Sequence, residues 1–247
     1  MGQERAAGAR AGRQVTRFGV VADIHGNFAA LGRVLARHPE VPFWLCVGDV
    51  ASLAGAYPEP VAPLYWIKGN NEAFDRVEAF RAGTDTIPNL HYIPNGLRFE
   101  VGGISIAGLG GTFAPTWYDT PAASLPRKSK DDKRRHFVRE EVEACKALGH
   151  VDVLLTHEAP KPFWTTLPSS TAPGKKWRRD VGKEAIAEAA DALRPKLHCF
   201  GHHHVQASFE RNGIPTVCVD RVNRGYVLVE ATTFAWQACA TDEEVRP

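Results

Sequence analysis

The stretch FGVVADIHGN, residues 18–27, sets the pattern on which the rest of the sequence is built. Its first half, residues 18–22, is short, apolar and rich in β-branched side chains, which predicts a buried strand. Asp23 and His25 follow directly after this strand. Apolar residues then recur at helical spacing as far as residue 37, and Asn27 is placed to cap this helix. A strand, a polar loop and a helix in succession indicate an α/β unit.

The same order recurs along the chain. Apolar runs at residues 43–47, 64–68, 152–156 and 197–200 each predict a buried strand. The polar groups that follow these strands are Gly48-Asp49, Gly69-Asn70-Asn71-Glu72, His157 and Gly201-His202-His203-His204. The predicted fold class is therefore α/β with a central sheet. Because the carboxyl ends of parallel strands lie at one edge of a sheet, these groups are expected to converge in one crevice.

The middle and the end of the chain carry other elements. Gly102-Gly103 joins two apolar segments and predicts a hairpin. Residues 131–148 predict one long helix, and residues 183–193 a shorter one. Between them, residues 159–182 form a loop long enough to be functional. Short β segments alternate with turns from residue 206 onward.

The composition is that of an ordinary globular protein. The 247 residues are 44% hydrophobic and 23% charged, with a formal net charge of +2, which excludes global disorder and a histone-like nucleic-acid protein. The sequence lacks an apolar run of about 18 residues, so no membrane span is expected. The five cysteines are scattered, which indicates a reduced, cytoplasmic compartment. Residues 1–16 predict a flexible basic tail, and residues 17–247 a single domain.

Seven of the polar side chains at the strand ends are of metal-ligand type. They are two carboxylates, one amide and four imidazoles: Asp23, Asp49, Asn70, His25, His157, His202 and His204. Oxygen and nitrogen ligands without thiolates suit manganese, iron, zinc or nickel better than a thiolate zinc site or a simple magnesium site. Seven ligands are too many for one catalytic ion, but they suit two ions that share a bridging carboxylate.

The spacing of these residues supports the same interpretation. In an extended loop, side chains two residues apart share a side, so Asp23 is expected to face the same ions as His25, and His202 the same ions as His204. The glycines at positions 26, 48, 69 and 201 are expected to let the backbone pass beside the ions without a Cβ clash.

The motifs DIHGN, GD, GNNE, TH and GHHH, in this order between Asp23 and His204, resemble those of the calcineurin-like metallophosphoesterase superfamily. That pattern is D-x-H, G-D, G-N-H-D/E, H and G-H-x-H. The resemblance covers nearly all of the chain that is expected to be ordered. It implies a four-layer α-β-β-α sandwich with two packed mixed sheets and a dinuclear metal site.

The resemblance also implies how the ligands divide between the ions. One ion would be held by Asp23, His25 and His204, and the other by Asn70, His157 and His202. Asp49 would bridge both. The cofactors are then two divalent metal ions, with manganese favoured over iron, zinc or nickel. A hydroxide between the ions would attack phosphorus in line.

Asn71 is a departure from this family, which usually has a histidine after the metal-binding asparagine, near the leaving group. An asparagine donates hydrogen bonds but cannot release a proton. Relatives without this histidine tend to prefer phosphodiesters, so we favour a phosphodiesterase. The alternatives are a phosphomonoesterase, in which another group supplies the proton, and a catalytically inactive scaffold. The retention of all seven ligands argues against the scaffold.

A weaker similarity joins residues 102–110, 136–140 and 218–229 to the RNA lariat-debranching subgroup, which cleaves 2′,5′ linkages in branched RNA. The chain keeps Asp23 where that subgroup has cysteine, and it has Asn71 where that subgroup has histidine. The expected partner is a phosphate-ester substrate, with a nucleotide or an RNA diester as candidates. Neither a membrane nor an obligate protein partner is expected.

Further roles are assigned to residues outside the ligand set. Asp49, Asn71 and His203 are the candidate catalytic residues, and His203 is expected to point away from its two neighbours rather than bind metal. Asn71, Arg178 and Arg179 are the candidate substrate contacts. The basic stretches at residues 127–139 and 174–183 indicate either a solvated surface or a positive rim that attracts phosphate groups.

Overall fold

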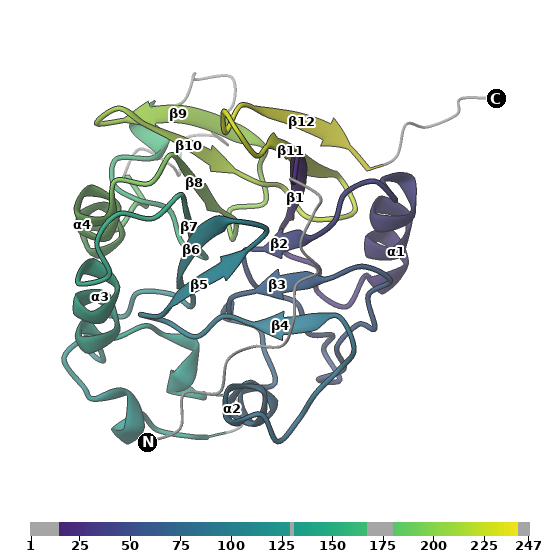
Figure 1. The fold of residues 1–247 in the computed structure, drawn as a ribbon. Helices are drawn as coiled ribbons and strands as arrows, with labels where there is room; N and C mark the ends of the chain where they lie inside the picture. The colour runs from purple at the N-terminus through teal and green to yellow at the C-terminus, as the bar shows by residue number, and fades with distance from the viewer. Residues whose placement is uncertain (1–14, 129–130, 167–179, 242–247) are drawn as a thin grey trace, which may run out of the picture.

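The computed structural model describes residues 15–128, 131–166 and 180–241 and arranges them in two six-stranded sheets (Figure 1). The first sheet has the order β12 (Trp236–Ala240), β11 (Gly225–Glu230), β1 (Arg17–Val21), β2 (Trp44–Cys46), β3 (Leu64–Trp66) and β4 (Leu90–Tyr92). The second has the order β5 (Arg98–Val101), β6 (Ile104–Leu109), β7 (Val153–Thr156), β8 (Leu197–Phe200), β10 (Ile214–Cys218) and β9 (Ala207–Arg211). In each sheet a block of parallel strands is completed by antiparallel ones, so both sheets are mixed.

Helices cover the outer faces of the two sheets (Figure 1). The helices α1 (Phe28–Arg37) and α2 (Phe74–Ala82) pack on the first sheet, and α3 (Arg139–Lys146) and α4 (Glu184–Leu193) on the second. Side chains alternate along the strands, so Val20 and Leu45 face the core between the sheets while Val21 and Trp44 face α1. The predicted four-layer α-β-β-α sandwich is therefore confirmed.

Local sequence signals place several of these elements. The Asn27 side chain accepts a hydrogen bond from the Ala30 amide at 3.1 Å, which is the predicted cap of α1. The predicted hairpin is β5 and β6, joined through Gly102 and Gly103, both of which have positive φ. The other predicted strands and helices are present, with bounds that agree with the predicted ones to within one or two residues, the usual uncertainty of element ends.

The segment at residues 131–148 differs from the single long helix that its periodicity predicts. It contains a 3-10 turn at Lys133–Arg135, then an extended stretch, and α3 only in its second half. The Lys68 ammonium donates to the backbone carbonyls of Arg134 at 3.0 Å and His136 at 3.2 Å. The chain turns at these carbonyls toward Lys68 instead of continuing the helical ladder of i to i−4 bonds, so the prediction was wrong for residues 131–138.

Hydrogen bonds from backbone amides join the strand ends within the first sheet and between the two sheets. The Asp23 amide donates to the Gly48 carbonyl at 3.1 Å and the His25 amide to the Asp49 carbonyl at 2.8 Å, which extends the pairing of β1 and β2. The His202 amide, after β8 in the second sheet, donates to the Asp23 carboxylate at 2.8 Å. The loops that carry the candidate ligands therefore meet at one edge of the sandwich.

Some expectations are not tested by this arrangement. Residues 1–14 of the predicted tail, Arg178 and Arg179 lie outside the described residues, and the division into a tail and one domain stays a prediction. Within the described ranges, none of the helices has the length and apolar content that crossing a membrane requires.

A pair of glycines offers a test of the packing of β1. A Cβ added to Gly19 would lie 2.2 Å from Cε3 of the buried Trp44, whereas one added to Gly32 in α1 meets nothing within 4 Å. Gly19→Ala is expected to lower the free energy of unfolding by about 1–3 kcal/mol, the usual cost of overpacking. Gly32→Ala is expected to raise it by roughly 0.4–1 kcal/mol, because the unfolded chain loses freedom. Urea unfolding measures both, and a Gly19→Ala protein as stable as the wild type would contradict this packing.

Candidate metal centre

The candidate ligands lie on loops with an uncommon backbone conformation. Among the described residues, nine non-glycine residues have positive φ. Five of the nine belong to the predicted site, namely Asp23 (47°), His25 (46°), Asp49 (56°), His202 (65°) and His204 (54°). This conformation costs on the order of 1–3 kcal/mol per residue and persists only where the surroundings enforce it. The loops are therefore not extended, contrary to the expectation from residue spacing.

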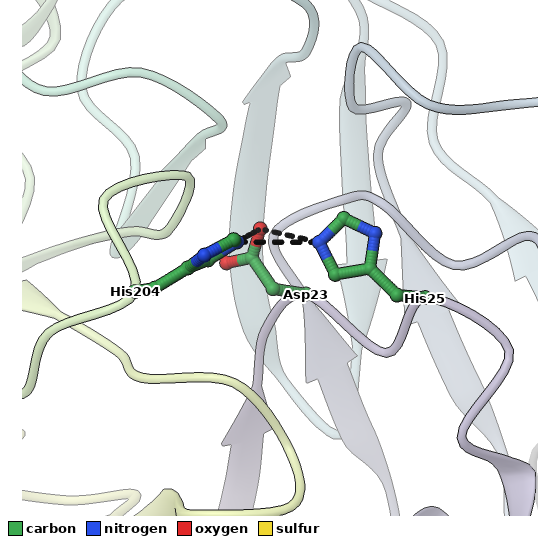
Figure 2. A group of neighbouring side chains, drawn as sticks. All are labelled: Asp23, His25 and His204. Atoms are coloured by element: carbon green, nitrogen blue, oxygen red, sulfur yellow. Dashed lines mark hydrogen bonds and ion pairs between the residues drawn. The ribbon is translucent and has the colours of Figure 1, made fainter.

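Asp23, His25 and His204 form the first group of candidate ligands (Figure 2). The Nε2 atoms of His25 and His204 lie 3.2 Å apart, and Asp23 Oδ1 lies 3.7 Å and 3.3 Å from them, respectively. Such separations suit three ligand atoms around one ion at about 2.0–2.2 Å. Asp23 Oδ1 is buried, and within the described part of the chain no hydrogen-bond donor reaches it. The donor set therefore fits a cation.

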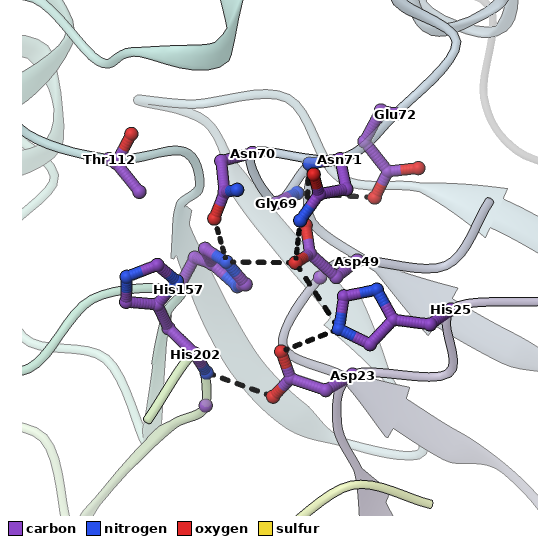
Figure 3. A network of polar contacts seen from close by, with 12 residues as sticks. Asp23, His25, Asp49, Gly69, Asn70, Asn71, Glu72, Thr112, His157 and His202 are labelled. Atoms are coloured by element: carbon purple, nitrogen blue, oxygen red, sulfur yellow. Dashed lines mark hydrogen bonds and ion pairs between the residues drawn. The ribbon is translucent and has the colours of Figure 1, made fainter. Parts of the chain in front are cut away.

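Asp49 lies between two histidines (Figure 3). Its Oδ2 atom is 3.6 Å from Nε2 of His25 and 3.6 Å from Nε2 of His157. Asp23, Asp49 and His157 form a second group, whose ligand atoms all lie within 4.8 Å of one another. A carboxylate placed between two such groups has the position that a bridging ligand requires.

His157 is held in one orientation by the backbone. Its Nδ1 atom donates to the Val47 carbonyl at 2.8 Å, which turns Nε2 toward the Asn70 amide oxygen at 3.0 Å. A metal-binding imidazole is commonly oriented by such a bond on its other nitrogen. The His202 ring lies beside it, with the two ring centroids 4.9 Å apart. The structure thus brings together the residues predicted for a second ion.

Two glycines let the carboxylates reach the centre. A Cβ on Gly69 would lie 2.0 Å from Asp49 Oδ1, and a Cβ on Gly201 would lie 2.5 Å from Asp23 Oδ2. Any side chain at either position would fill the space that the carboxylate occupies. At these two glycines the close approach of the backbone is therefore present against the carboxylates, and their role beside the ions stays a prediction.

The charges of the centre are coupled. Burial favours the neutral form of Asp49, but His157 and the hydrogen bonds from Asn71 outweigh it and hold the pKa of this carboxyl below its usual range. Burial also opposes the charge of His157, yet Asp49 and Asp23 raise the pKa of this imidazole. Burial, reinforced by His157, lowers the pKa of His202 to about 4. The positively charged form of His157 is therefore stabilised beside Asp49. His202 stays neutral, which is the protonation state in which an imidazole coordinates a metal.

Glu72 is a residue of this site to which the sequence analysis assigned no role. Its Oε1 atom accepts from the amides of Val50 at 3.0 Å and Gly69 at 3.2 Å. Its Oε2 atom accepts from the Ala51 amide at 3.1 Å and the Tyr57 hydroxyl at 3.0 Å. Each carboxylate oxygen of Glu72 therefore accepts two hydrogen bonds.

These bonds tie the loop that carries Asp49 to the loop that carries Asn70. Burial and the nearby Asp49 carboxylate raise the pKa of Glu72 to about 7, and the backbone donors oppose that rise. The GNNE motif could have indicated a role for Glu72, because it places an acidic residue two positions after the candidate ligand Asn70. Tyr57 carried no such signal, because it follows a loop without a recognisable pattern.

His203 points away from its neighbours, as expected. Its ring centroid lies 4.9 Å from that of Phe163, 5.4 Å from that of Trp164 and 6.2 Å from that of Phe200. Its Nε2 atom is buried among these rings and has no polar partner within the described part of the chain. The geometry brings His203 into an aromatic cluster, so its assignment as a catalytic residue gains no support.

Asn71 occupies the outer side of the centre. Its backbone amide donates to Asp49 Oδ1 at 2.7 Å and its side-chain amide to Asp49 Oδ2 at 2.8 Å. Asn71 is nevertheless exposed, and with His25 and Asn70 it lines a cavity of about 670 Å³ beside the centre. It is therefore placed to contact a substrate. The other candidate contacts, Arg178 and Arg179, lie outside the described residues.

Comparison with known proteins agrees with this arrangement. A family model for calcineurin-like phosphoesterases matches residues 16–206. A lariat debranching enzyme of Schizosaccharomyces pombe is 26% identical over 204 residues. The match covers 74% of this chain but only 42% of that enzyme, so the chain spans less than half the length of this relative.

Solved structures share the fold. The protein TT1561 of Thermus thermophilus superposes with a TM-score of 0.61 at 12% identity, over 92% of this chain and 100% of that one. GAP50, described as the anchor in the inner membrane complex of Plasmodium, superposes with a TM-score of 0.52 at 11% identity, over 92% and 85% of the two chains. At such identities the likeness shows the fold alone.

The role of Glu72 can be tested with Glu72→Gln. The amide has one acceptor oxygen in place of two, so its NH₂ group would face two of the four donors. We expect a loss of about 1–3 kcal/mol in the free energy of unfolding, and a loss of about 10–100-fold in Mn²⁺ affinity, as for other residues that orient ligands. Urea unfolding and Mn²⁺ titration measure these. Glu210→Gln, at an exposed position in β9, is the control, and equal behaviour of the two variants would refute the role.

Proposed function

Because the chain belongs to the calcineurin-like phosphoesterase family, we propose that it hydrolyses phosphate esters at the centre formed by Asp23, Asp49 and His157, and that its substrates are phosphodiesters. The observation that carries this proposal is the position of Asp49 Oδ2, 3.6 Å from both His25 and His157. A carboxylate so placed would be shared by two ions, and two ions would stabilise the attacking and leaving oxygens of the phosphoryl group.

We propose two divalent ions as cofactors. The residues that would hold them are Asp23, His25 and His204 for one ion, Asn70, His157 and His202 for the other, and Asp49 for both. When bound, the ions supply Lewis-acid stabilisation of the charge that develops on the phosphoryl oxygens. The set of oxygen and nitrogen ligands supports manganese first, with iron, zinc and nickel as alternatives.

The preference for diesters rests on Asn71. Its side-chain amide donates one hydrogen bond to Asp49 at 2.8 Å, which leaves its second N–H for a substrate oxygen. An amide cannot release a proton, so Asn71 is no general acid. A phosphomonoester with a poor leaving group depends most on such an acid. A diester is therefore the substrate that suits this chain.

The substrate we favour is a nucleotide or RNA diester. The name of the Schizosaccharomyces pombe relative is the support for RNA, and branched RNA is included among the candidates. The match covers less than half of that enzyme, so the debranching activity of the relative is carried over only as a proposal. The compartment we propose is the cytoplasm, because all five cysteines are free thiols and four of them are buried.

A catalytically inactive scaffold is the alternative function. A structure of the same fold is described as an anchor, so the fold by itself does not decide between the two functions. Asp23 Oδ1 supports the enzyme, because it is buried without a hydrogen bond and faces the imidazoles of His25 and His204, an arrangement that a scaffold does not need.

The proposed activity predicts metal-dependent turnover of a bis-aryl phosphate diester in excess of the matching aryl monoester. Protein stripped of metal would be reloaded with Mn²⁺ and assayed with both substrates. Asp49→Ala is expected to lose all turnover, while Asp119→Ala, at an exposed surface carboxylate, keeps it. Dominant monoester cleavage would make the substrate class wrong. Absence of turnover with two ions bound would favour the scaffold.

The role of Asn71 predicts a gain of function. Asn71→His places a group that can release a proton at this position. We expect the ratio of monoester to diester turnover to rise on the order of 100-fold, the lower range of what a general acid contributes. Steady-state kinetics on the two aryl substrates measure this ratio. An unchanged ratio would show that another group already supplies the proton.

A further inference from the structure

The cavity of about 670 Å³ beside the metal centre is also lined by residues that do not belong to the centre. His25, Asn70 and Asn71 line the cavity, and Figure 3 shows the two asparagines next to each other above Asp49. Arg134 and Arg135 line it as well. They belong to the segment that Lys68 draws out of the predicted helix. A volume of this size suits a small organic ligand, for which pockets of about 300–1,000 Å³ are usual.

Arg134 is engaged by two carboxylates through its Nε and Nη2 atoms. It donates to Asp132 at 2.6–3.1 Å and to Asp75 at 2.7 Å, and it is buried. The single positive charge of Arg134 is thus shared between these two carboxylates. The remaining acid at the cavity, Glu72, is engaged by four donors from the protein. The acidic residues that line the cavity therefore all accept hydrogen bonds from other groups of the protein.

Arg135 is the second cation that lines the cavity, and the acids that interact with it electrostatically, Asp131 and Asp132, lie on its own segment. Its Nε atom donates to the backbone carbonyl of Asp132 at 2.9 Å, which holds the side chain in place. Within residues 15–128, 131–166 and 180–241, no carboxylate pairs with its guanidinium. It is half-buried, and its remaining N–H donors have the planar fork that binds phosphate through two bonds.

We propose that Arg135 binds a second phosphate on the substrate, carried by the ester arm that occupies this cavity. The preferred substrate is then a phosphodiester with a further phosphate on one arm, as in a nucleic acid longer than a dinucleotide. Leu53, which is fully exposed at the same cavity, and Phe74 supply apolar surface for the organic part of that arm. This inference rests on the proposed function, because it assigns the substrate of the same centre.

The test compares three RNA dinucleotides, one without a terminal phosphate, one with a 5′-phosphate and one with a 3′-phosphate. The Mn²⁺-loaded wild type is expected to cleave one phosphorylated form with a kcat/KM about 10-fold or more above that of the unphosphorylated form, the usual gain from a charged hydrogen bond. Arg135→Gln is expected to bring this ratio to one, and Arg135→Lys to leave part of it. Arg139→Gln, exposed on the same segment, should keep both the ratio and the activity.

A binding measurement separates this inference from the proposed function. Calorimetry would compare adenosine 3′,5′-bisphosphate with adenosine 5′-monophosphate on the wild type and on Arg135→Gln. Tighter binding of the bisphosphate to the wild type alone supports the role of Arg135 whether or not any diester is cleaved. Equal cleavage of the three dinucleotides, with equal binding of the two nucleotides, would overturn it and leave the phosphodiesterase proposal standing. Absence of all diester turnover would instead overturn the proposed function.

Discussion

The buried carboxylate of Asp49 is the group around which the strand ends are arranged. It accepts two hydrogen bonds from Asn71 on the loop after β3, and it lies 3.6 Å from His25 after β1 and from His157 after β7. Removing a carboxylate from water is costly unless charge and hydrogen bonds compensate it. Each of these loops supplies part of that compensation, so each must come close. The absence of a side chain at Gly69 makes the approach sterically possible.

This convergence requires backbone conformations that a chain does not adopt by itself. Five candidate site residues have positive φ, among them Asp23 and Asp49. Hydrogen bonds between the loops after β1 and β2 hold them there. Behind these loops lies the tightly packed core between the sheets, which supports the strained turns. The strained backbone conformations thus occur in the loops that fix the positions of two carboxylates and four imidazoles.

Charged side chains also determine the backbone conformation of the segment that lines the cavity beside the metal centre. The segment at residues 131–138 has a helical pattern, but Lys68 binds two of its carbonyls and Arg134 is held by two carboxylates. The bonds from Lys68 and to Asp75 are long-range and outweigh local helix propensity, and Arg135 comes to line the cavity beside the metal centre. A fold shared with proteins of different descriptions does not determine which substrate is bound; that depends on such side chains.

The elements and the candidate ligands could be predicted from local sequence patterns. The apolar runs, the cap at Asn27 and the glycine pair at Gly102-Gly103 act locally, so each follows from a few neighbouring residues. The polar groups at the strand ends predicted which side chains would meet, because parallel strands end at one edge. The left-handed turns, the role of Glu72, the burial of His203 among aromatic rings and the position of Arg135 became visible only in the folded chain. Each of these features depends on contacts between residues that are distant in the sequence. A local sequence pattern carries no information about the energies of such contacts.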